Sequence, residues 1–538
     1  MFPSKNQVIK WKIYSTIALL AIITALIIIS LPYFLYPPYK YESHEGNEQA
    51  LEAEITIETK DKVGEIDPNI YGHFLEHLGR CIYGGIWVGE NSPIPNLRGM
   101  RLDVLEAVKA IDPPIIRWPG GNFVSGYHWE DGIGPRDKRP TLSNRAWGGT
   151  ESNQFGTDEF IDFCREVGAE PYIVVNVGSG TPEEAAHWVE YCNGDVNTPY
   201  GRLRAQYGHT EPYNVKYWGI GNEMYGTWQI GYMTETAYAQ AAVNFAKAMK
   251  SVDPTIKLIP VGWYGATGSS ASWNNKVLKA TGSYIDYLSL HAYCYHPAYI
   301  DYSGIVNFPL EVESTLKETI NQIHSVIVED KLGKDIDIAF DEWNVWYLEA
   351  EAATGLTQTS RLCDGLFAAG MFNVFHRLAN NVTMANLAQL VNVLPAIVTN
   401  DRGELYVNPI YLAFKLYRNN TGKIVLRTST TGVFVVSYLD VSATMDEDGN
   451  RLYLAVINKD LTKKLNATIS LKDFKPRQTC KLFQLNGPSW DSKNDFTSPD
   501  TVKITNKDAT IDVKDKSFVY DFEPHSVTII ILERSTTN

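Results

Sequence analysis

Near-continuous apolar runs alternate with amphipathic segments between residues 65 and 392 of the chain. A run such as YIVVNV, at 172–177, is typical of a strand that is buried on both faces of a parallel sheet. Eight strand candidates recur with helical segments between them, at 65–74, 113–121, 170–178, 215–223, 256–263, 285–293, 335–343 and 382–392. Eight such repeats predict an α/β fold of the (β/α)8 TIM-barrel type.

Two helix boundaries are marked by residues of known capping behaviour. Thr181 supplies an N-cap, with Pro182 at the first helical position and acidic residues directly after it. Asp253-Pro254 is expected to close another helix, because proline cannot continue one. Both signals fall between predicted strands, as barrel helices should.

The hydrophobic pattern changes after about residue 400. Short strands with turn residues between them are expected at 432–441, 451–459, 466–474, 478–485, 509–515 and 526–533. This spacing predicts a C-terminal antiparallel β-sandwich domain over 401–538. The (β/α)8 barrel domain is then expected over 53–400, with its first strand, 53–59, joining the sandwich.

The N-terminus carries a different pattern. Three lysines precede a stretch without charged residues from Ile13 to Tyr36, which is 24 residues long (36 − 13 + 1). About 20 residues suffice for a helix to cross a bilayer, and flanking lysines favour a cytoplasmic N-terminus. The sequence therefore predicts an N-terminal transmembrane helix within 1–36, a polar tether over 37–52 and a membrane-anchored protein whose barrel domain is extracytoplasmic. The alternative is a cleaved signal segment, which would make the protein secreted.

Composition and charge exclude several classes. The 538 residues include 48 basic and 62 acidic side chains, giving a net charge of −14, and no basic cluster appears. A nucleic-acid partner is therefore not expected, because phosphate binding needs a basic face. The six cysteines form no CxxC pair, so they permit disulfides without requiring them and indicate no zinc site.

Polar residues occupy the predicted strand ends. These are Arg117, Asn176, Asn222-Glu223, Trp263, His291, Glu342 and Gln389. In a (β/α)8 barrel the carboxyl ends of the strands meet at one face, where the reactive groups lie. A single such residue could be a strand cap or a core ion pair, but seven of eight strand ends form a pattern.

Glu223 and Glu342 are the candidate catalytic pair. Glycosidic cleavage requires one carboxylic acid to protonate the leaving oxygen and one carboxylate to meet the anomeric carbon. The alternative is a structural role for both, as ion-pair partners of residues such as Arg117. Tryptophans near the strand ends strengthen the carbohydrate interpretation, because aromatic faces pack against sugar C–H groups. These are Trp118, Trp129, Trp147, Trp218, Trp228, Trp263, Trp343 and Trp346.

A competing motif, HFLEH at 73–77, matches the H-x-x-E-H pattern of inverted zinc peptidases. That chemistry needs both histidines on one turn of a helix and a third ligand downstream. Gly72 and Gly79 bracket the motif, and strand-like sequence precedes it, so helical geometry is not expected. We therefore expect no metal here and interpret Glu76 as an acceptor for a sugar hydroxyl.

Five long motifs occur in co-linear order: YGHFLEHLGRCIYGG, RWPGGNFVSGYHWEDGIGPRDKRP, GIGNEMYGTWQIG, AFDEWNVWY and ANLAQLVNVLPAI. Together they resemble the α-L-arabinofuranosidases of glycoside hydrolase family 51 over about residues 55–420. The resemblance implies a retaining, exo-acting hydrolase that removes terminal α-L-arabinofuranosyl residues from arabinan, arabinoxylan or related oligosaccharides. It requires no cofactor or metal, and it implies self-association as a trimer or hexamer.

Site residues follow from the resemblance, motif by motif. Glu223 in GNE would be the general acid/base, and Glu342 in DEW the nucleophile. Four residues would bond the furanose hydroxyls: Glu76, Asn122, Asn222 and Gln389. Four more would surround the nucleophile or line the site: Arg117, His291, Tyr293 and Trp147. The implied double displacement calls for carboxyl groups about 5–5.5 Å apart and for a raised pKa at Glu223.

Two features depart from the family pattern, and two other functions stay open. The loop after Tyr293 does not align clearly, which leaves contacts beyond the arabinose undefined, and a membrane segment is not typical of the family. One alternative keeps the scaffold but makes the enzyme an endo-glucanase or another glycosidase. The other is a non-catalytic, membrane-displayed carbohydrate-binding protein.

Overall fold

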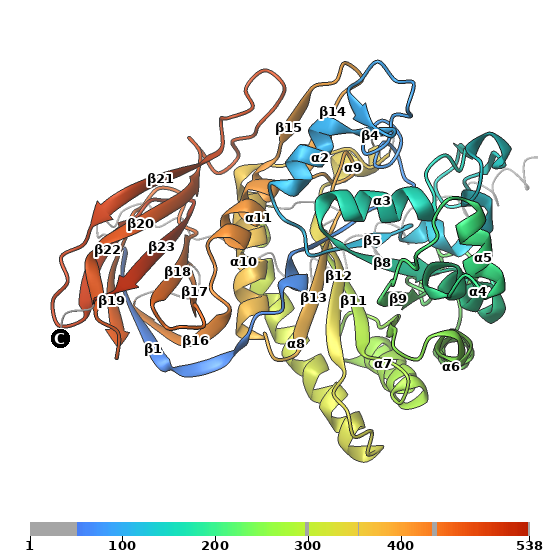
Figure 1. Ribbon diagram of the computed structural model, residues 1–538. Coiled ribbons are helices and arrows are strands. Elements are labelled where there is room, and N and C mark those ends of the chain that lie inside the picture. The colour runs from blue at the N-terminus through green and yellow to red at the C-terminus, as the bar shows by residue number, and fades with distance from the viewer. Residues whose placement is uncertain (1–50, 296–300, 353–354, 433–437, 536–538) are drawn as a thin grey trace, which may run out of the picture. The chain divides into compact units, whose positions relative to one another are not determined.

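The computed structural model describes residues 51–295, 301–352, 355–432 and 438–535 (Figure 1). Eight parallel strands pair side by side in the order β10-β9-β8-β5-β2-β13-β12-β11. A single parallel bridge between Val261, directly after β10, and Ser289 of β11 joins the two ends of this sheet. The predicted (β/α)8 barrel is confirmed. Its strands are β2 (Gly72–Phe74), β5 (Ile115–Trp118), β8 (Glu170–Val175), β9 (Tyr217–Ile220), β10 (Lys257–Pro260), β11 (Tyr287–Tyr295), β12 (Asp337–Trp346) and β13 (Val382–Ala388).

The first barrel strand is much shorter than the sequence pattern suggests. Only Gly72–Phe74 pair as β2, while Pro68–Tyr71 form a 3-10 turn. The Asp67 side chain accepts a hydrogen bond from the Asn69 amide at 2.9 Å, and Pro68 stands at the first position of that turn. A capped turn with proline at its start competes with strand pairing, so the apolar run is divided.

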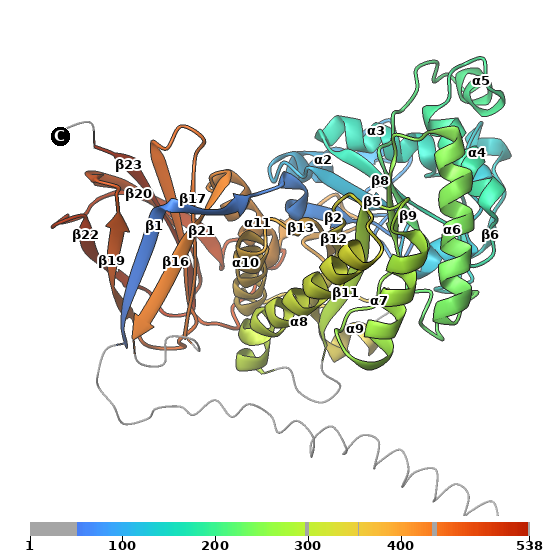
Figure 2. The same ribbon diagram turned by 90° about the horizontal axis from the view of Figure 1, so that it is seen from below.

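Helices follow the strands along the chain, and Figure 2 shows α6, α7 and α8 on the outer side of the barrel strands. The Thr181 hydroxyl accepts from the Glu184 amide at 3.1 Å and caps α4, and Asp253 is the C-cap of α6. Both predicted helix boundaries are thus confirmed. The helices are α2 (Leu102–Lys109), α3 (Thr157–Val167), α4 (Pro182–Asn193), α5 (Pro199–Gln206), α6 (Glu235–Val252), α7 (Gly268–Thr281), α8 (Tyr302–Glu329), α9 (Leu348–Ala352), α10 (Leu362–Arg377) and α11 (Pro409–Asn419).

A second, nine-stranded sheet has the order β21-β20-β23-β18-β17-β16-β1-β19-β22. The first strand of the chain, β1 (Leu51–Glu65), lies inside this sheet, antiparallel to β16 and parallel to β19. Ile55 and Ile57 on β1 are fully buried in the core of the sheet domain. The other strands are β16 (Ile424–Gly432), β17 (Leu439–Met445), β18 (Arg451–Asn458), β19 (Leu465–Lys472), β20 (Pro476–Asn486), β21 (Lys503–Thr510), β22 (Ser517–Phe522) and β23 (Ser526–Arg534).

Helix α10 connects the two sheets through buried polar contacts. Arg377 donates to Asp440 of β17 at 2.8 Å, and Asn373 donates to the same carboxylate at 3.1 Å. His376 lies between the Ser442 hydroxyl of β17, at 2.9 Å, and the Tyr71 hydroxyl at 2.8 Å. The barrel and the sheet domain therefore share a hydrogen-bonded boundary.

The transmembrane part of the predicted fold needs correction. In the part of the chain that the structure describes, no helix combines the length and the apolar character that a membrane crossing requires. Even α8, with 28 residues, carries Glu311, Glu313 and Lys317 in its middle. The expectation rested on Ile13–Tyr36, which lies outside the described residues, as does all of the predicted tether except Leu51 and Glu52. The described residues therefore give no support to the predicted transmembrane helix or to the membrane-anchored, extracytoplasmic localisation inferred from it.

Candidate active site

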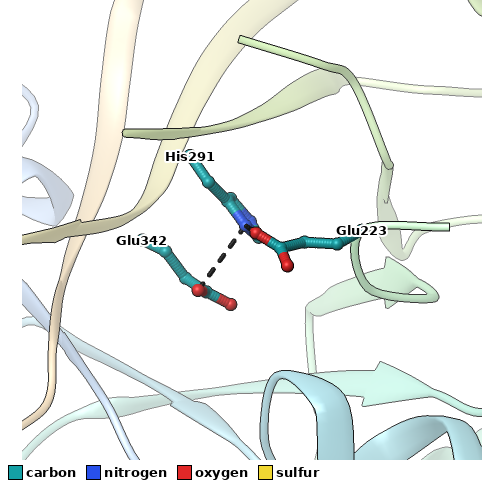
Figure 3. A group of neighbouring side chains, drawn as sticks. All are labelled: Glu223, His291 and Glu342. Carbon is teal, nitrogen blue, oxygen red and sulfur yellow. Dashed lines mark hydrogen bonds and ion pairs between the residues drawn. The ribbon is translucent and has the colours of Figure 1, made fainter. Parts of the chain in front are cut away.

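Two carboxylates, one after β9 and one in β12, point at one imidazole ring on β11, between them in the barrel. Glu223 follows β9, after a turn in which Gly221 and Glu223 both have positive φ, and Glu342 lies within β12 next to His291 of β11. Figure 3 shows the three side chains converging, and their polar atoms lie within 4.8 Å of one another. The structure therefore brings together two carboxylates that are 119 residues apart in sequence (342 − 223).

Glu342 is buried and held by donors on both oxygens. Arg117 donates to Oε1 at 2.6 Å, and the Tyr293 hydroxyl donates to Oε2 at 2.8 Å. The second terminal nitrogen of Arg117 donates to Asn222 at 2.6 Å, and its guanidinium stacks 4.6 Å from the centre of the Phe74 ring. This fixed geometry leaves the carboxylate of Glu342 little freedom to turn away from the cavity.

Glu223 accepts from Trp228 at 3.0 Å through Oε2 and lies 3.0 Å from His291 Nδ1 through Oε1. Burial alone would raise the pKa of Glu223, but the hydrogen bond and positive charge of His291, with smaller contributions from Trp228 and Arg117, outweigh it, so the pKa is lowered. The sequence-based expectation of a raised pKa is therefore not met here. Burial lowers the pKa of His291, yet Glu342, Asp341 and Glu223 together raise it to about 10. The proton between Glu223 and His291 thus resides on the imidazole.

Asp341 is a buried carboxylate that sequence reasoning missed. It accepts from the Ser289 hydroxyl at 2.6 Å and from the Tyr172 hydroxyl at 2.8 Å, and it lies 3.4 Å from His291 Nε2. Burial would raise its pKa, but the charges of Arg117 and His291 hold the pKa at about 2. A register shift in β12 places one extra residue opposite Leu290, which lets the consecutive side chains of Asp341 and Glu342 both reach the interior. Two acidic residues in succession inside an apolar strand were the available signal.

Glu76 forms a second polar corner of the cavity. Its Oε1 accepts from the Phe123 amide at 3.0 Å and from Trp147 Nε1 at 2.8 Å, and its Oε2 accepts from Gln389 at 3.1 Å. Burial raises the pKa of Glu76 to about 7, against the effect of these hydrogen bonds and with a smaller contribution from the charge of Glu342. The carboxyl group of Glu76 therefore changes its charge near neutral pH.

The cavity between these groups has a volume of about 580 Å³. Seven of the ten predicted site residues line it. The other three lie behind the wall: Arg117 bonds Glu342, His291 bonds Glu223, and Asn222 accepts from Arg117. Buried polar atoms of Asn222 and Gln389, Nδ2 and Oε1, have no partner within the described chain. The lining residues are Phe74, Glu76, Leu78, Gly121, Asn122, Trp147, Glu223, Trp228, Tyr293, Tyr295, Glu342, Trp346, Glu351, Leu356, Gln389 and Leu394.

Several of these wall residues were not foreseen. Tyr295 is the last residue of β11, whereas Glu351 and Leu356 come from the segment after β12, and no pattern in the sequence marked them. Trp228 is 62% exposed although it bonds Glu223, so it stands at the mouth of the cavity.

The two histidines of the HFLEH motif do not face a common point. His73 lies in β2 with its ring 4.4 Å from the ring of Phe414, whereas His77 bonds Trp118 and Glu151. The motif runs from a strand into a turn, so the helical geometry of a zinc peptidase is absent from this described segment. Among the described residues, the side chains close enough to share a metal ion are Glu223, His291 and Glu342 themselves.

A parallel eight-stranded barrel with two close carboxylates at the carboxyl ends of its strands defines a glycoside hydrolase of the (β/α)8 class. Comparison with known families narrows this class. Two family models match, the alpha-L-arabinofuranosidase 1 domain over residues 107–304 and the alpha-L-arabinofuranosidase C-terminal domain over residues 341–526. The chain belongs to the α-L-arabinofuranosidases of glycoside hydrolase family 51.

Individual relatives agree with this assignment. A probable alpha-L-arabinofuranosidase C of Aspergillus niger is 38% identical over 505 residues, covering 88% of this chain and 96% of that protein. An intracellular exo-alpha-L-arabinofuranosidase of Bacteroides ovatus is 36% identical over 474 residues, covering 84% and 90%. The alpha-L-arabinofuranosidase of Thermotoga maritima, solved with arabinose, is 44% identical with a TM-score of 0.83, covering 89% of this chain and 100% of that one.

The predicted family and enzyme class are confirmed. Neither alternative, an endo-glucanase or a non-catalytic binding protein, is favoured by these relatives. A family 44 endoglucanase of Clostridium thermocellum shares 14% identity with a TM-score of 0.59, which shows the fold alone. The Bacteroides ovatus relative is named an intracellular enzyme, so this comparison does not support the predicted membrane-anchored localisation.

Proposed function

We propose that the protein releases terminal α-L-arabinofuranosyl residues by double displacement, with Glu342 as nucleophile and Glu223 as general acid/base. The observation that carries this proposal is the approach of the two carboxylates, with oxygens within 4.8 Å of each other. Carboxyl groups about 5–5.5 Å apart suit a covalent intermediate, whereas about 6.5–9.5 Å is needed to fit a water between sugar and base. Retention of anomeric configuration follows.

In the first step Glu342 attacks the anomeric carbon while the glycosidic C–O bond breaks. The leaving oxygen takes a proton from Glu223, and the sugar becomes esterified to Glu342. In the second step Glu223 accepts a proton from water, the water oxygen bonds to the anomeric carbon, and Glu342 leaves as a carboxylate. Arg117 and Tyr293 orient Glu342 throughout, because both bond its oxygens.

His291 explains how Glu223 can act as a general acid although its pKa is lowered. In the resting site the proton lies on Nδ1 of the imidazole, 3.0 Å from Glu223. Transfer along this contact gives a neutral imidazole and a protonated Glu223, so the pair as a whole acts as the acid. Esterification of Glu342 removes one of the charges that hold the proton on His291.

The remaining polar residues of the cavity suit a pentose. Gln389, Glu76 and Asn122 line the cavity and offer amide and carboxyl groups to the furanose hydroxyls, and Trp147 forms a wall. Behind this wall, Asn222 adds a buried Nδ2 that has no partner among the described residues. Arabinan, arabinoxylan or related oligosaccharides are the proposed substrates, which makes the role catabolic, in L-arabinose metabolism. The self-association as a trimer or hexamer implied by the family resemblance stays a prediction, which the mass of the protein in solution tests.

Replacement of each carboxylate tests the assignment. Glu342→Ala should abolish hydrolysis of 4-nitrophenyl α-L-arabinofuranoside, because no covalent intermediate can form. Glu223→Ala should retain slow turnover of this activated substrate, which needs little acid help, and azide should accelerate it because an anion attacks without a base. Release of arabinose from branched and debranched arabinan would then define the linkage. Full activity of the Glu342→Ala variant would overturn the assignment.

A further inference from the structure

Trp147 reaches the cavity on a hairpin that has almost no core of its own. The hairpin consists of β6 (Leu142–Ser143) and β7 (Thr150–Glu151). From residue 142 to residue 151 only Asn144 and Glu151 are buried, and the tip, Gly148-Gly149, has positive φ at both residues. An isolated two-stranded hairpin is marginally stable in water, so external anchors must hold this one in place.

Both buried residues of the hairpin are anchored on His77. Asn144 donates through Nδ2 to the His77 carbonyl at 2.9 Å, and Glu151 Oε2 lies 2.7 Å from His77 Nδ1. Asn144 also accepts from the Trp147 amide at 3.0 Å. The second histidine of HFLEH is therefore the point to which the whole hairpin is attached.

A neighbouring tryptophan sets the protonation of His77. Trp118 Nε1 lies 3.1 Å from His77 Nε2, and an indole nitrogen can only donate. Nε2 is thus an acceptor, and the imidazole is neutral with its proton on Nδ1, from where it donates to Glu151. The Glu151 carboxylate also accepts from the Asn153 amide at 2.7 Å and from the Tyr83 hydroxyl.

We propose that Glu151 is a positioning residue for hydrolysis, which acts through His77 and the hairpin to hold Trp147 as a wall of the arabinose site. Glu151 does not line the cavity, but Trp147 does, and Trp147 Nε1 donates to Glu76 at 2.8 Å. His77 directly follows Glu76 in the chain. The same turn therefore holds His77, to which the hairpin is attached, and Glu76, to which Trp147 donates. This inference rests on the proposed function, because Trp147 matters for catalysis only if the cavity binds the sugar.

Glutamine cannot replace Glu151 without conflict. The carboxylate meets donors on both oxygens, His77 Nδ1 on one side and the Asn153 amide with the Tyr83 hydroxyl on the other. An amide NH2 on either side would face a donor that cannot turn away. His77 could change tautomer only by losing its bond from Trp118.

The test combines kinetics with hydrogen exchange in Glu151→Gln, Trp147→Ala and the double variant. Glu151→Gln should raise KM for 4-nitrophenyl α-L-arabinofuranoside about tenfold with a smaller change in kcat, and it should speed amide exchange within residues 142–150. The double variant should be no worse than Trp147→Ala alone, since both changes remove the same wall. Glu151→Asp should recover part of the loss.

Asp158→Asn is the matched control, because Asp158 is also a buried carboxylate and accepts from two tyrosine hydroxyls, those of Tyr191 and Tyr213. It should lower the melting temperature but leave KM and hairpin exchange unchanged. Additive effects of Glu151→Gln and Trp147→Ala, or unchanged hairpin exchange, would overturn the proposal.

If Glu151→Gln does not fold, Tyr83→Phe removes one donor and should speed hairpin exchange less strongly; no change there also overturns the proposal. Failure of the wild-type protein to hydrolyse the arabinofuranoside would instead count against the proposed function. The exchange measurement needs no substrate, so these two failures are distinguishable.

Discussion

The position of one proton governs the chemistry at the scale of single residues. His291 faces Glu223 from the loop after β9, Asp341 and Glu342 from β12, and the Ser289 hydroxyl from its own strand. Three carboxylates around one imidazole keep it charged, and Arg117 offsets the excess of negative charge. Glu223 and His291 together act as the general acid of the reaction. A change of charge beside His291 therefore alters the pH range over which this pair holds its proton.

Asp341→Asn tests this directly. It removes a buried negative charge 3.4 Å from His291 Nε2 and lowers the imidazole pKa from its raised value of about 10. The alkaline limb of kcat/KM should therefore move to lower pH, by about one unit or more. Asp337→Asn is the control, because Asp337 lies at the other end of the same strand and bonds Thr383. An alkaline limb that stays in place in Asp341→Asn would exclude His291 as the holder of the proton.

At the scale of elements, the apolar runs and the residues that end them were readable from sequence, but local departures from regular structure were not. Arg117, Glu223 and Glu342 were found because polar residues at the ends of buried strands are conspicuous. Asp341 was missed because strand alternation turns it away from Glu342, and only the extra residue in β12 brings it inward. Sequence reveals the period of a strand, whereas a bulge depends on how the neighbouring strand pairs.

The strand β1 offers an element-scale prediction. Ile55 is fully buried between β16 and β19, so Ile55→Ala should lower the free energy of unfolding by about 3 kcal/mol through lost burial and the cavity left behind. Glu54→Ala, one residue earlier on the exposed face, should change it by less than about 0.5 kcal/mol. Urea unfolding curves of the two variants measure both values, and equal losses would place β1 outside the core.

At the scale of the whole molecule, buried histidines mark the regions where α10 and α11 pack. Burial lowers the pKa of His73, beside Phe414 of α11, and that of His376, in α10 opposite β17, from 6.5 to about 3. The folded protein keeps both rings neutral while the unfolded chain takes up protons below about pH 6.5. The free energy of unfolding therefore falls as the pH falls, by about 2 kcal/mol per histidine at pH 5.

His73→Phe should remove one of these contributions. Among the described residues, neither ring nitrogen of His73 has a hydrogen-bond partner. Phenylalanine should therefore stabilise the protein already at neutral pH and flatten the loss of stability between pH 6.5 and pH 4. His324→Gln is the control, because His324 is exposed and should leave the pH slope unchanged. Chemical unfolding at several pH values gives the slopes; equal slopes for His73→Phe and the wild type would mean that His73 takes up a proton in the folded protein.

The place of β1 in the nine-stranded sheet has a consequence for biosynthesis. Leu51 pairs with Leu465, so 414 residues (465 − 51) must leave the ribosome before this pairing can form. At about 5–20 residues per second, the nascent strand waits for about 20 to 80 s. During translation its apolar face has no partner. Its charged alternate residues, Glu52, Glu54 and Glu58, disfavour pairing with the strands of other growing chains, because charges on a strand oppose edge-to-edge association.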